Sequence, residues 1–475
     1  MRPLEILIPA LLAVYILWPL ITRRARPVLV NFIPPLALLL NLAHFALEGY
    51  RWQMIPLYIL TAALAALNLP TLFKADSANE PPRGWGAAAS FLTLGLLAVS
   101  TALPALLPVP RVAEPSGPFK VGTQTFVLTD ANRRELYSGR DEPRKFMIQV
   151  WYPAAPRPTD VRAPWMQNVD IFGPAIADYL NLPHYFLDHL ALSKSPAFQN
   201  SPLAKSDQPF PVILFSHGWN GFAAQNSAQM VELASHGYAI VALQHTYGAV
   251  VTVFPDGEVA LNNPNALPKG MPEPGYTDAA RLLVNQWAGD LAYALDFMTA
   301  QNADAASPFH AALPQVSRAG VYGHSTGGGA AIQFCGTDPR CVAGLTEDAF
   351  MTPVSQEILD RGVKQPFFFL FSQSWTDDVN SKNNRLFHEF YFHLPAPAPV
   401  ATILGTRHYD FSDLPLLSPL APQLGLKGPI NGNLVVKILN DYLLAYFDQE
   451  LKGIPSPIPF GPSADYPDLR WEIFK

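Results

Sequence analysis

The sequence predicts an α/β fold, a mostly parallel sheet with helices on both faces, preceded by a bundle of four transmembrane helices. Three observations predict it. Residues 1–110 hold only seven Lys/Arg and four Asp/Glu. After residue 118, short apolar strand patterns alternate with helical ones. Residues 108–118 (PVPRVAEPSGP) are Pro-rich and polar, as in linkers. We expect a transmembrane region over residues 1–110, a linker over 111–118 and a second domain over 119–475.

The membrane prediction rests on the length and number of the apolar runs. Each run is close to the ~20 residues that a helix needs to cross the hydrocarbon layer. The runs are Pro3 to Thr22, Val28 to Leu47, Met54 to Phe73 and Gly86 to Leu107. A cleaved signal peptide would show one shorter run, so it does not fit. His44, alone within the second run, is expected to form a helix–helix hydrogen bond.

The loop charges predict the orientation. The loops after the first and third runs carry Arg23, Arg24, Arg26, Lys74 and Arg83, whereas the opposite side carries Arg2 and Arg51. Cytoplasmic loops are enriched in basic residues. We therefore expect an integral, multi-pass membrane protein whose second domain lies outside the cytoplasm.

Charge and cysteine content exclude several classes of protein. The net charge of −6 argues against a nucleic-acid partner, which would need a basic face. The two cysteines, Cys335 and Cys341, are too few for a structural zinc site. A local disulfide and two free thiols both remain open. We expect no metal and no cofactor.

Regular elements of the second domain follow the hydrophobic pattern. Buried strands are predicted at residues 145–152, 210–216, 238–244, 320–323, 342–345, 366–371 and 400–404, and helices at 224–236, 278–299, 326–335 and 433–451. Two stretches, 154–208 and 248–276, do not fit this rhythm. Loops of this length are often functional lids, and the alternative is that they are surface loops without a function.

The strongest motif is Gly323-His324-Ser325-Thr326-Gly327, which lies between a predicted strand and a glycine-rich helix start. A tight strand-to-helix turn of this kind exposes the serine hydroxyl above the sheet edge. The helix start adds backbone N–H groups and a positive dipole end. This context predicts an α/β-hydrolase fold with Ser325 as the nucleophile. His324 is expected to point away from the substrate.

A second motif, Ser216-His217-Gly218-Trp219, follows a buried strand directly. In α/β-hydrolases the loop after such a strand donates one backbone N–H to the oxyanion hole, and the residue after the nucleophile donates another. Trp219 and Thr326 are therefore the two predicted donors. We expect His217 to organise the loop rather than to transfer protons.

The remaining catalytic candidates follow the nucleophile in the order that this fold uses. His408 comes after a strand-like run and before the last helix, which makes it the predicted base. The acid is open between Asp348, after the first strand beyond the elbow helix, and Asp377, after the second. Glu347 is the neighbour most easily confused with Asp348.

Taken together, several segments resemble the plasma-type platelet-activating factor acetylhydrolases. They are the stretch from Val212 to Gln244, the elbow GHSTGGGAA, and the segments GLTEDAFMTP and GTRHYDFSD. The resemblance covers roughly residues 117–451 and implies that Asp348 is the acid. Two features depart from the family: it has Phe where this chain has Thr326, and the N-terminal bundle lies outside its secreted pattern.

These observations predict a serine carboxylic-ester hydrolase with a Ser-His-Asp triad and an acyl-enzyme intermediate. Its partners would be the membrane bilayer and a lipid ester such as a short sn-2 acyl phospholipid. The alternatives are a neutral-ester lipase or polyester hydrolase, an acyltransferase that uses the same triad, and a catalytically inactive membrane protein that binds lipid or a partner.

Overall fold

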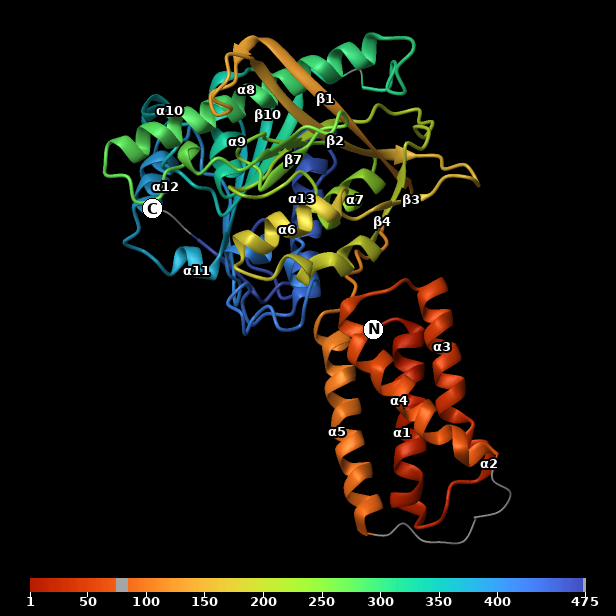
Figure 1. Ribbon diagram of the computed structural model, residues 1–475. Helices are drawn as coiled ribbons and strands as arrows, with labels where there is room; N and C mark the ends of the chain where they lie inside the picture. Colours follow the sequence, from red (N-terminus) through yellow and green to blue (C-terminus); the bar gives the residue numbers. More distant parts are fainter. Residues whose placement is uncertain (74–83, 314, 473–475) are drawn as a thin grey trace. The chain divides into compact units, whose positions relative to one another are not determined.

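The computed structural model describes residues 1–73, 84–313 and 315–472. The chain divides into two compact units (Figure 1). Unit 1 comprises residues 1–110, 185–193 and 417–420, and unit 2 comprises residues 111–184, 194–416 and 421–475. Nothing in the apolar pattern indicated that the two short later segments join unit 1, because neither contains a long apolar run.

Unit 1 is a helical bundle. Its helices are α1 (Pro3–Thr22), α2 (Val28–Asn31), α3 (Ile33–Leu47), α4 (Ile55–Leu72) and α5 (Gly84–Leu106), with the 3-10 turns η1 (Trp52–Met54) and η2 (His184–Leu192). Helices α3 and α5 both pack against α1 and α4, and the four long helices run side by side in Figure 1. The predicted helices are thus confirmed as helices.

By length and composition, four stretches of unit 1 are apolar enough to cross a membrane: Pro3–Thr22, Val28–Leu47, Trp52–Leu72 and Gly86–Leu106. Crossing itself remains a prediction. Of the charges used to predict the orientation, Lys74 and Arg83 lie outside the described residues.

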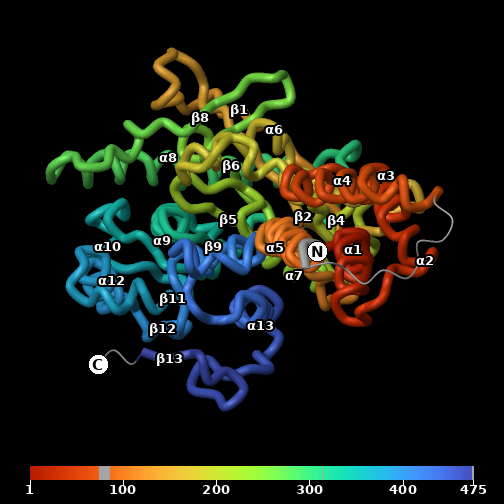
Figure 2. Tube along the Cα trace, turned by 60° about the horizontal axis from the view of Figure 1, so that its bottom comes forward, coloured from red at the N-terminus to blue at the C-terminus, as the bar shows by residue number. Residues whose placement is uncertain are grey.

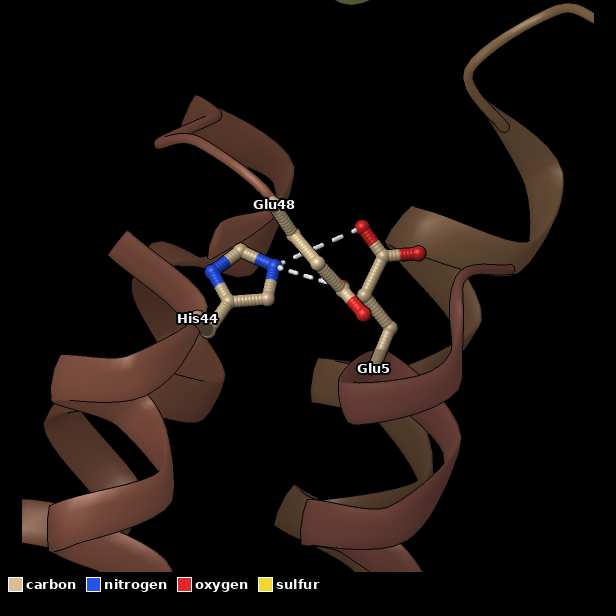
Figure 3. A group of neighbouring side chains, drawn as sticks. All are labelled: Glu5, His44 and Glu48. Carbon is tan, nitrogen blue, oxygen red and sulfur yellow. Dashed lines mark ion pairs between the residues drawn. The ribbon is translucent and has the colours of Figure 1, made fainter. Parts of the chain in front are cut away.

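Charged side chains are buried at one end of the bundle. Figure 3 shows Glu5 of α1 facing His44 and Glu48 at the end of α3, with His44 Nε2 3.6 Å from an oxygen of each carboxylate. Two guanidinium groups also reach Glu5, Arg2 at 2.8 Å and Arg51 at 2.7 Å. Arg2 Nη2 lies only 3.1 Å from His44 Nε2. Because arginines already compensate the carboxylates, this group forms an ion-pair network rather than a cation site.

Polar bonds also join the apolar helices directly. His44 Nδ1 lies 3.1 Å from the Tyr58 hydroxyl of α4, which confirms the expected helix–helix hydrogen bond. The Tyr15 hydroxyl of α1 donates to Asn68 Oδ1 of α4 at 3.1 Å. In apolar surroundings such bonds satisfy groups that would otherwise be costly to bury.

Unit 2 is built on a sheet of eleven strands within the described residues, in the order β13-β12-β11-β10-β9-β5-β6-β2-β1-β4-β3. The strands are β1 (Lys120–Arg134), β2 (Pro143–Ala154), β3 (Arg162–Pro164), β4 (Lys194–Gln199), β5 (Val212–Ser216), β6 (Ala239–Gln244), β9 (Ala319–His324), β10 (Cys341–Glu347), β11 (Phe367–Ser372), β12 (Val400–Ile403) and β13 (Leu469–Trp471). The block from β12 to β6 is parallel throughout, which confirms the mostly parallel α/β prediction.

Helices cover both faces of this sheet (Figures 1 and 2). Helix α7 (Ser227–Ser235) packs with α13 (Gly432–Lys452), and α8 (Gly275–Ala303) packs with α9 (Thr326–Thr337). Every residue of β5, β6 and β9 is buried, as their uninterrupted apolar runs require. The smaller helices are α6 (Val169–Tyr179), α10 (Gln356–Arg361), α11 (Gln373–Thr376) and α12 (Lys382–Phe392), with 3-10 turns η3 (Pro264–Ala266), η4 (His408–Phe411) and η5 (Leu414–Leu416).

The two stretches that lacked a clear pattern contain short regular elements. Residues 154–208 include β3, α6 and β4, and residues 248–276 include a hairpin of β7 (Val251–Val253) and β8 (Val259–Leu261). Their short lengths and many prolines conceal these elements from a periodicity argument.

The two cysteines, which the sequence left open, form a disulfide. Cys335 at the end of α9 is bonded to Cys341 at the start of β10. The bond closes the turn between the elbow helix and the next strand.

Candidate active site

Ser325 occupies the sharp turn between β9 and α9. Its backbone has φ +57° and ψ −120°, a region that non-glycine residues rarely adopt and that is typical of functional sites. The turn is tight enough to require glycine around it. A Cβ on Gly327 would lie 1.9 Å from the carbonyl oxygen of Ser216, and one on Gly323 would lie 2.2 Å from that of Gly327. The flanking glycines therefore allow β5 and the elbow to approach each other.

His408 and Asp348 lie together on the loops after β12 and β10. His408 Nδ1 is 2.9 Å from Asp348 Oδ2. The Asp348 side chain is buried, and Ser372 donates to it twice, from its backbone N–H to Oδ1 and from its hydroxyl to Oδ2, both at 2.7 Å. A carboxylate held in this way fixes the tautomer and orientation of the imidazole.

Two further rings contact the His408 imidazole. Trp375 stacks on it with a centroid distance of 4.5 Å and an interplanar angle of 12°, and the His324 ring lies 4.5 Å away. His324 Nε2–H donates to the His408 carbonyl at 3.0 Å. His324 also lines the pocket beside Ser325, so the expectation that it points away from the site was wrong. Burial lowers the pKa of His324 well below its ordinary value, which keeps this ring neutral.

Ser325 and His408 open into one pocket of about 220 Å³. Helix α6 contributes Ile176 and Tyr179 to its wall, and the Tyr179 hydroxyl lies 3.1 Å from that of Tyr409. The described wall carries no Asp, Glu, Lys or Arg side chain; its residues are Ile176, Tyr179, Leu180, Gly218, Trp219, Asn220, Gly221, Phe222, Gln225, Val250, His324, Ser325, His408, Tyr409, Ser412, Leu414 and Leu426. The pocket therefore suits an uncharged, largely apolar group.

Both predicted oxyanion residues adjoin the serine. Gly218 approaches so closely that a Cβ on it would lie 3.2 Å from Ser325 Cβ, and Trp219 lines the same pocket. Thr326 is the first residue of α9, so its N–H is among those that have no partner within the helix. The two candidate amides thus belong to different segments, the loop after β5 and the start of α9.

The other acidic candidates have different surroundings. Glu347 is buried, and its carboxyl accepts from Gln229 Nε2 at 2.7 Å and from Asn226 Nδ2 at 3.0 Å. Burial raises the pKa of Glu347 well above its ordinary value, while its hydrogen bonds with Gln229 and Asn226 oppose this shift. Asp377 is exposed at the end of α11. Of these carboxyls, Asp348 is the one that the structure brings to His408.

Sequence reasoning missed Trp375, Ser372 and the α6 residues of the pocket wall. Ser372 is the last residue of β11 and Trp375 follows this strand, in the region that suggested Asp377. Their position at a carboxyl strand end was the available signal, because parallel strands carry functional groups there.

Comparisons with known proteins agree with this architecture. The model of the family described as "Platelet-activating factor acetylhydrolase, isoform II" matches residues 108–266 and 309–454. The chain is 26% identical over 356 residues to the platelet-activating factor acetylhydrolase of Cavia porcellus, covering 71% of this chain and 77% of that protein. It is 25% identical over 407 residues to a protein of Arthroderma benhamiae named "Probable 1-alkyl-2-acetylglycerophosphocholine esterase", covering 78% and 95% of the two chains.

Among solved structures, a ferulic acid esterase from Streptomyces cinnamoneus is similar in fold. The TM-score is 0.62 at 23% sequence identity, and the match covers 76% of this chain and 99% of that one.

Proposed function

Because the chain belongs to the platelet-activating factor acetylhydrolase family and is therefore a carboxylic-ester hydrolase, we propose that Ser325, His408 and Asp348 form its catalytic triad. The observation that carries this proposal is the His408–Asp348 pair, whose imidazole opens into the same pocket as the strained Ser325. The α/β-hydrolase order of nucleophile, acid and histidine supports it.

In the proposed mechanism Ser325 Oγ attacks the ester carbonyl while His408 Nε2 takes the serine proton. The imidazolium then protonates the leaving alkoxide, and an acyl-enzyme remains. Asp348 holds the Nδ1–H and stabilises the imidazolium. The amides of Trp219 and Thr326 stabilise the tetrahedral oxyanion. A water molecule activated by His408 releases the acid in the second half-reaction.

For the substrate we propose a lipid ester with a short sn-2 acyl group. The names of the relatives support this class, since both concern hydrolysis of acetylated glycerophospholipids. The pocket wall supports it as well, because its uncharged residues suit an acyl group and leave a polar head group outside.

We further propose that helices α1, α3, α4 and α5 anchor the protein in a membrane, with the catalytic unit outside the cytoplasm. Large apolar side chains on the outside of the bundle support anchoring, among them Leu29 at 83% and Leu67 at 77% exposure. The Cys335–Cys341 disulfide supports the oxidising side, where such bonds persist.

The activity is tested on the full-length protein in detergent. Nitrophenyl esters from acetyl to dodecanoyl and a 2-acetyl phospholipid are compared for wild type, Ser325→Ala and the exposed control Ser206→Ala. We expect turnover and fluorophosphonate labelling in wild type and control, and neither in Ser325→Ala. A folded wild type with no turnover and no labelling refutes the enzyme, and a preference for long neutral esters favours a lipase instead.

Membrane insertion has its own measurement. Alkaline carbonate extraction of expressing cells should leave the chain in the membrane fraction. A reporter enzyme that is active only outside the cytoplasm should be active when fused after Lys475. A reporter that is active only inside the cytoplasm should be inactive at the same position. Release by carbonate contradicts the anchor, and the opposite reporter pattern contradicts the orientation.

A further inference from the structure

The peptide bond that carries the Trp219 amide is fixed by a neighbouring histidine. The Gly218 carbonyl oxygen of this peptide lies 2.7 Å from His217 Nδ1 and also accepts the Gly221 N–H at 2.9 Å. In a trans peptide the C=O and N–H point in opposite directions. Holding the Gly218 oxygen against His217 therefore directs the Trp219 N–H to the other side. A rotated peptide would present an oxygen where the donor should be.

The tautomer of His217 is determined by its second contact. Its Nε2 accepts the backbone N–H of His245 at 3.2 Å, so the ring proton must lie on Nδ1, where it is donated to Gly218. Both contacts are satisfied only by the neutral ring. Burial lowers the pKa of His217 well below its ordinary value, in agreement with that state.

His245 is in turn held by a buried Ser-His-Asp chain. The Ser216 hydroxyl donates to His245 Nε2, and His245 Nδ1–H donates to Asp290 Oδ2, both at 2.9 Å. Trp287 stacks on the His245 ring at 4.2 Å, and Arg144 pairs with Asp290 at 2.6 Å. The order of groups is that of a catalytic triad, but Ser216, His245 and Asp290 each have 0% exposure. No substrate reaches Ser216, so these three residues do not act as a second nucleophilic centre.

Backbone bonds link the same histidine to the oxyanion loop. The His245 carbonyl accepts the N–H groups of Gly248 and Ala249, and the Gly248 carbonyl accepts the Asn220 N–H at 3.0 Å. Asn220 has φ +57°, a conformation that must be maintained by its surroundings. His245 therefore supports the oxyanion loop by two routes. One is the hydrogen bond to His217, and the other is this turn.

We propose that His217 is a positioning residue that locks the Gly218–Trp219 peptide with its N–H toward the reacting oxygen, and that the buried Ser216–His245–Asp290 chain holds His217 in this role. The inference rests on the proposed function, since it concerns the oxyanion of the Ser325 reaction. It predicts that His217 affects the stabilisation of the transition state more than substrate binding.

The test uses full-length wild type, His217→Leu and His217→Asn, with His310→Leu as an exposed histidine control. Leucine removes the donor, whereas an asparagine amide places an N–H near the position of Nδ1. We expect His217→Leu to lower kcat by about 10²–10³-fold with KM within about twofold of wild type. The kcat of His217→Asn should be at least about tenfold higher than that of His217→Leu.

A second readout separates positioning from a general structural effect. Each enzyme hydrolyses an acetyl ester and the matching thiono ester, whose C=S group accepts hydrogen bonds poorly. Wild type should prefer the oxygen ester, and this preference should fall at least about tenfold in His217→Leu. Thermal unfolding of each variant reports folding. If His217→Leu does not fold, Ser216→Ala, which frees His245 Nε2, should lower the same preference.

Equal losses for both esters, or a kcat of His217→Leu within about threefold of wild type, overturn the inference. If Ser216→Ala is the variant used, an unchanged preference for the oxygen ester over the thiono ester also overturns the inference. Failure of the proposed function is visible separately, because wild type would then lack both turnover and fluorophosphonate labelling.

Discussion

Asp348→Asn offers the sharpest test of the proposed triad, because the carboxylate accepts three hydrogen bonds. Ser372 supplies two at 2.7 Å and His408 Nδ1 one at 2.9 Å. An asparagine keeps the shape but replaces one acceptor by an NH₂ group. With its oxygen toward the Ser372 N–H, this group faces Nδ1 and drives the imidazole proton to Nε2. His408 then cannot accept the serine proton.

The expected loss follows from the wrong tautomer. We expect kcat to fall about 10⁴-fold, which at about 1.36 kcal/mol per tenfold corresponds to roughly 5 kcal/mol of activation free energy. Nitrophenyl acetate turnover gives kcat, and thermal unfolding shows that the variant is folded. Glu347→Gln and Asp377→Asn are the controls, both expected within about threefold of wild type because neither carboxyl contacts His408. An Asp348→Asn enzyme with more than about a tenth of wild-type kcat, or a large loss in Asp377→Asn, would refute the assignment.

Three further outcomes are expected. Gly327→Ala should unfold at a lower temperature and lose activity, since its Cβ would lie 1.9 Å from a backbone oxygen, whereas Gly461→Ala, with open space around it, should match wild type. Replacing Cys335 and Cys341 by serine should lower the free energy of unfolding by about 2 kcal/mol in denaturant titrations; equal stability of reduced and oxidised wild type would contradict this. Burial raises the pKa of Asp413 to about 6, so between about pH 4 and 6 the folded protein retains a proton that the unfolded chain releases. The contribution of this protonated carboxyl to the free energy of unfolding is therefore lost as pH rises from about 4 to about 6. The difference in Tm between wild type and Asp413→Asn should therefore shrink over that range, and a constant difference would contradict it.

Periodicity predicted the central sheet because its strands are buried on both faces. The runs at 210–216 and 366–371 needed no knowledge of their neighbours, and the observed strands β5 and β11 differ from them by one or two residues. The helix at residues 326–335 was predicted from its small residues, and the observed α9 begins at the same residue. The terminal helix predicted at residues 433–451 agrees with α13 to within one residue at each end.

Contacts between segments distant in sequence were beyond such reasoning. The stacking of Trp375 on His408 and the donation from His324 to the His408 carbonyl depend on tertiary packing, which no local pattern encodes. Likewise, no local pattern connected Ser216, at the end of a predicted strand, with His245. Only the fold shows that Asp290, on helix α8, completes a buried hydrogen-bond network with these two residues.

The order of strands in the sheet also bears on how the protein folds. The central neighbours β5 and β9 are separated along the chain by residues 217–318, so their pairing requires the closure of a long loop. Such non-local pairing is slow, whereas in unit 1 helix α3 packs against α1 and α4, which lie close to it in sequence. During synthesis the N-terminal bundle can assemble while the sheet is still incomplete. In the proposed triad, ester hydrolysis becomes possible only after the ribosome has added His408, so a reactive serine appears when the chain is nearly finished.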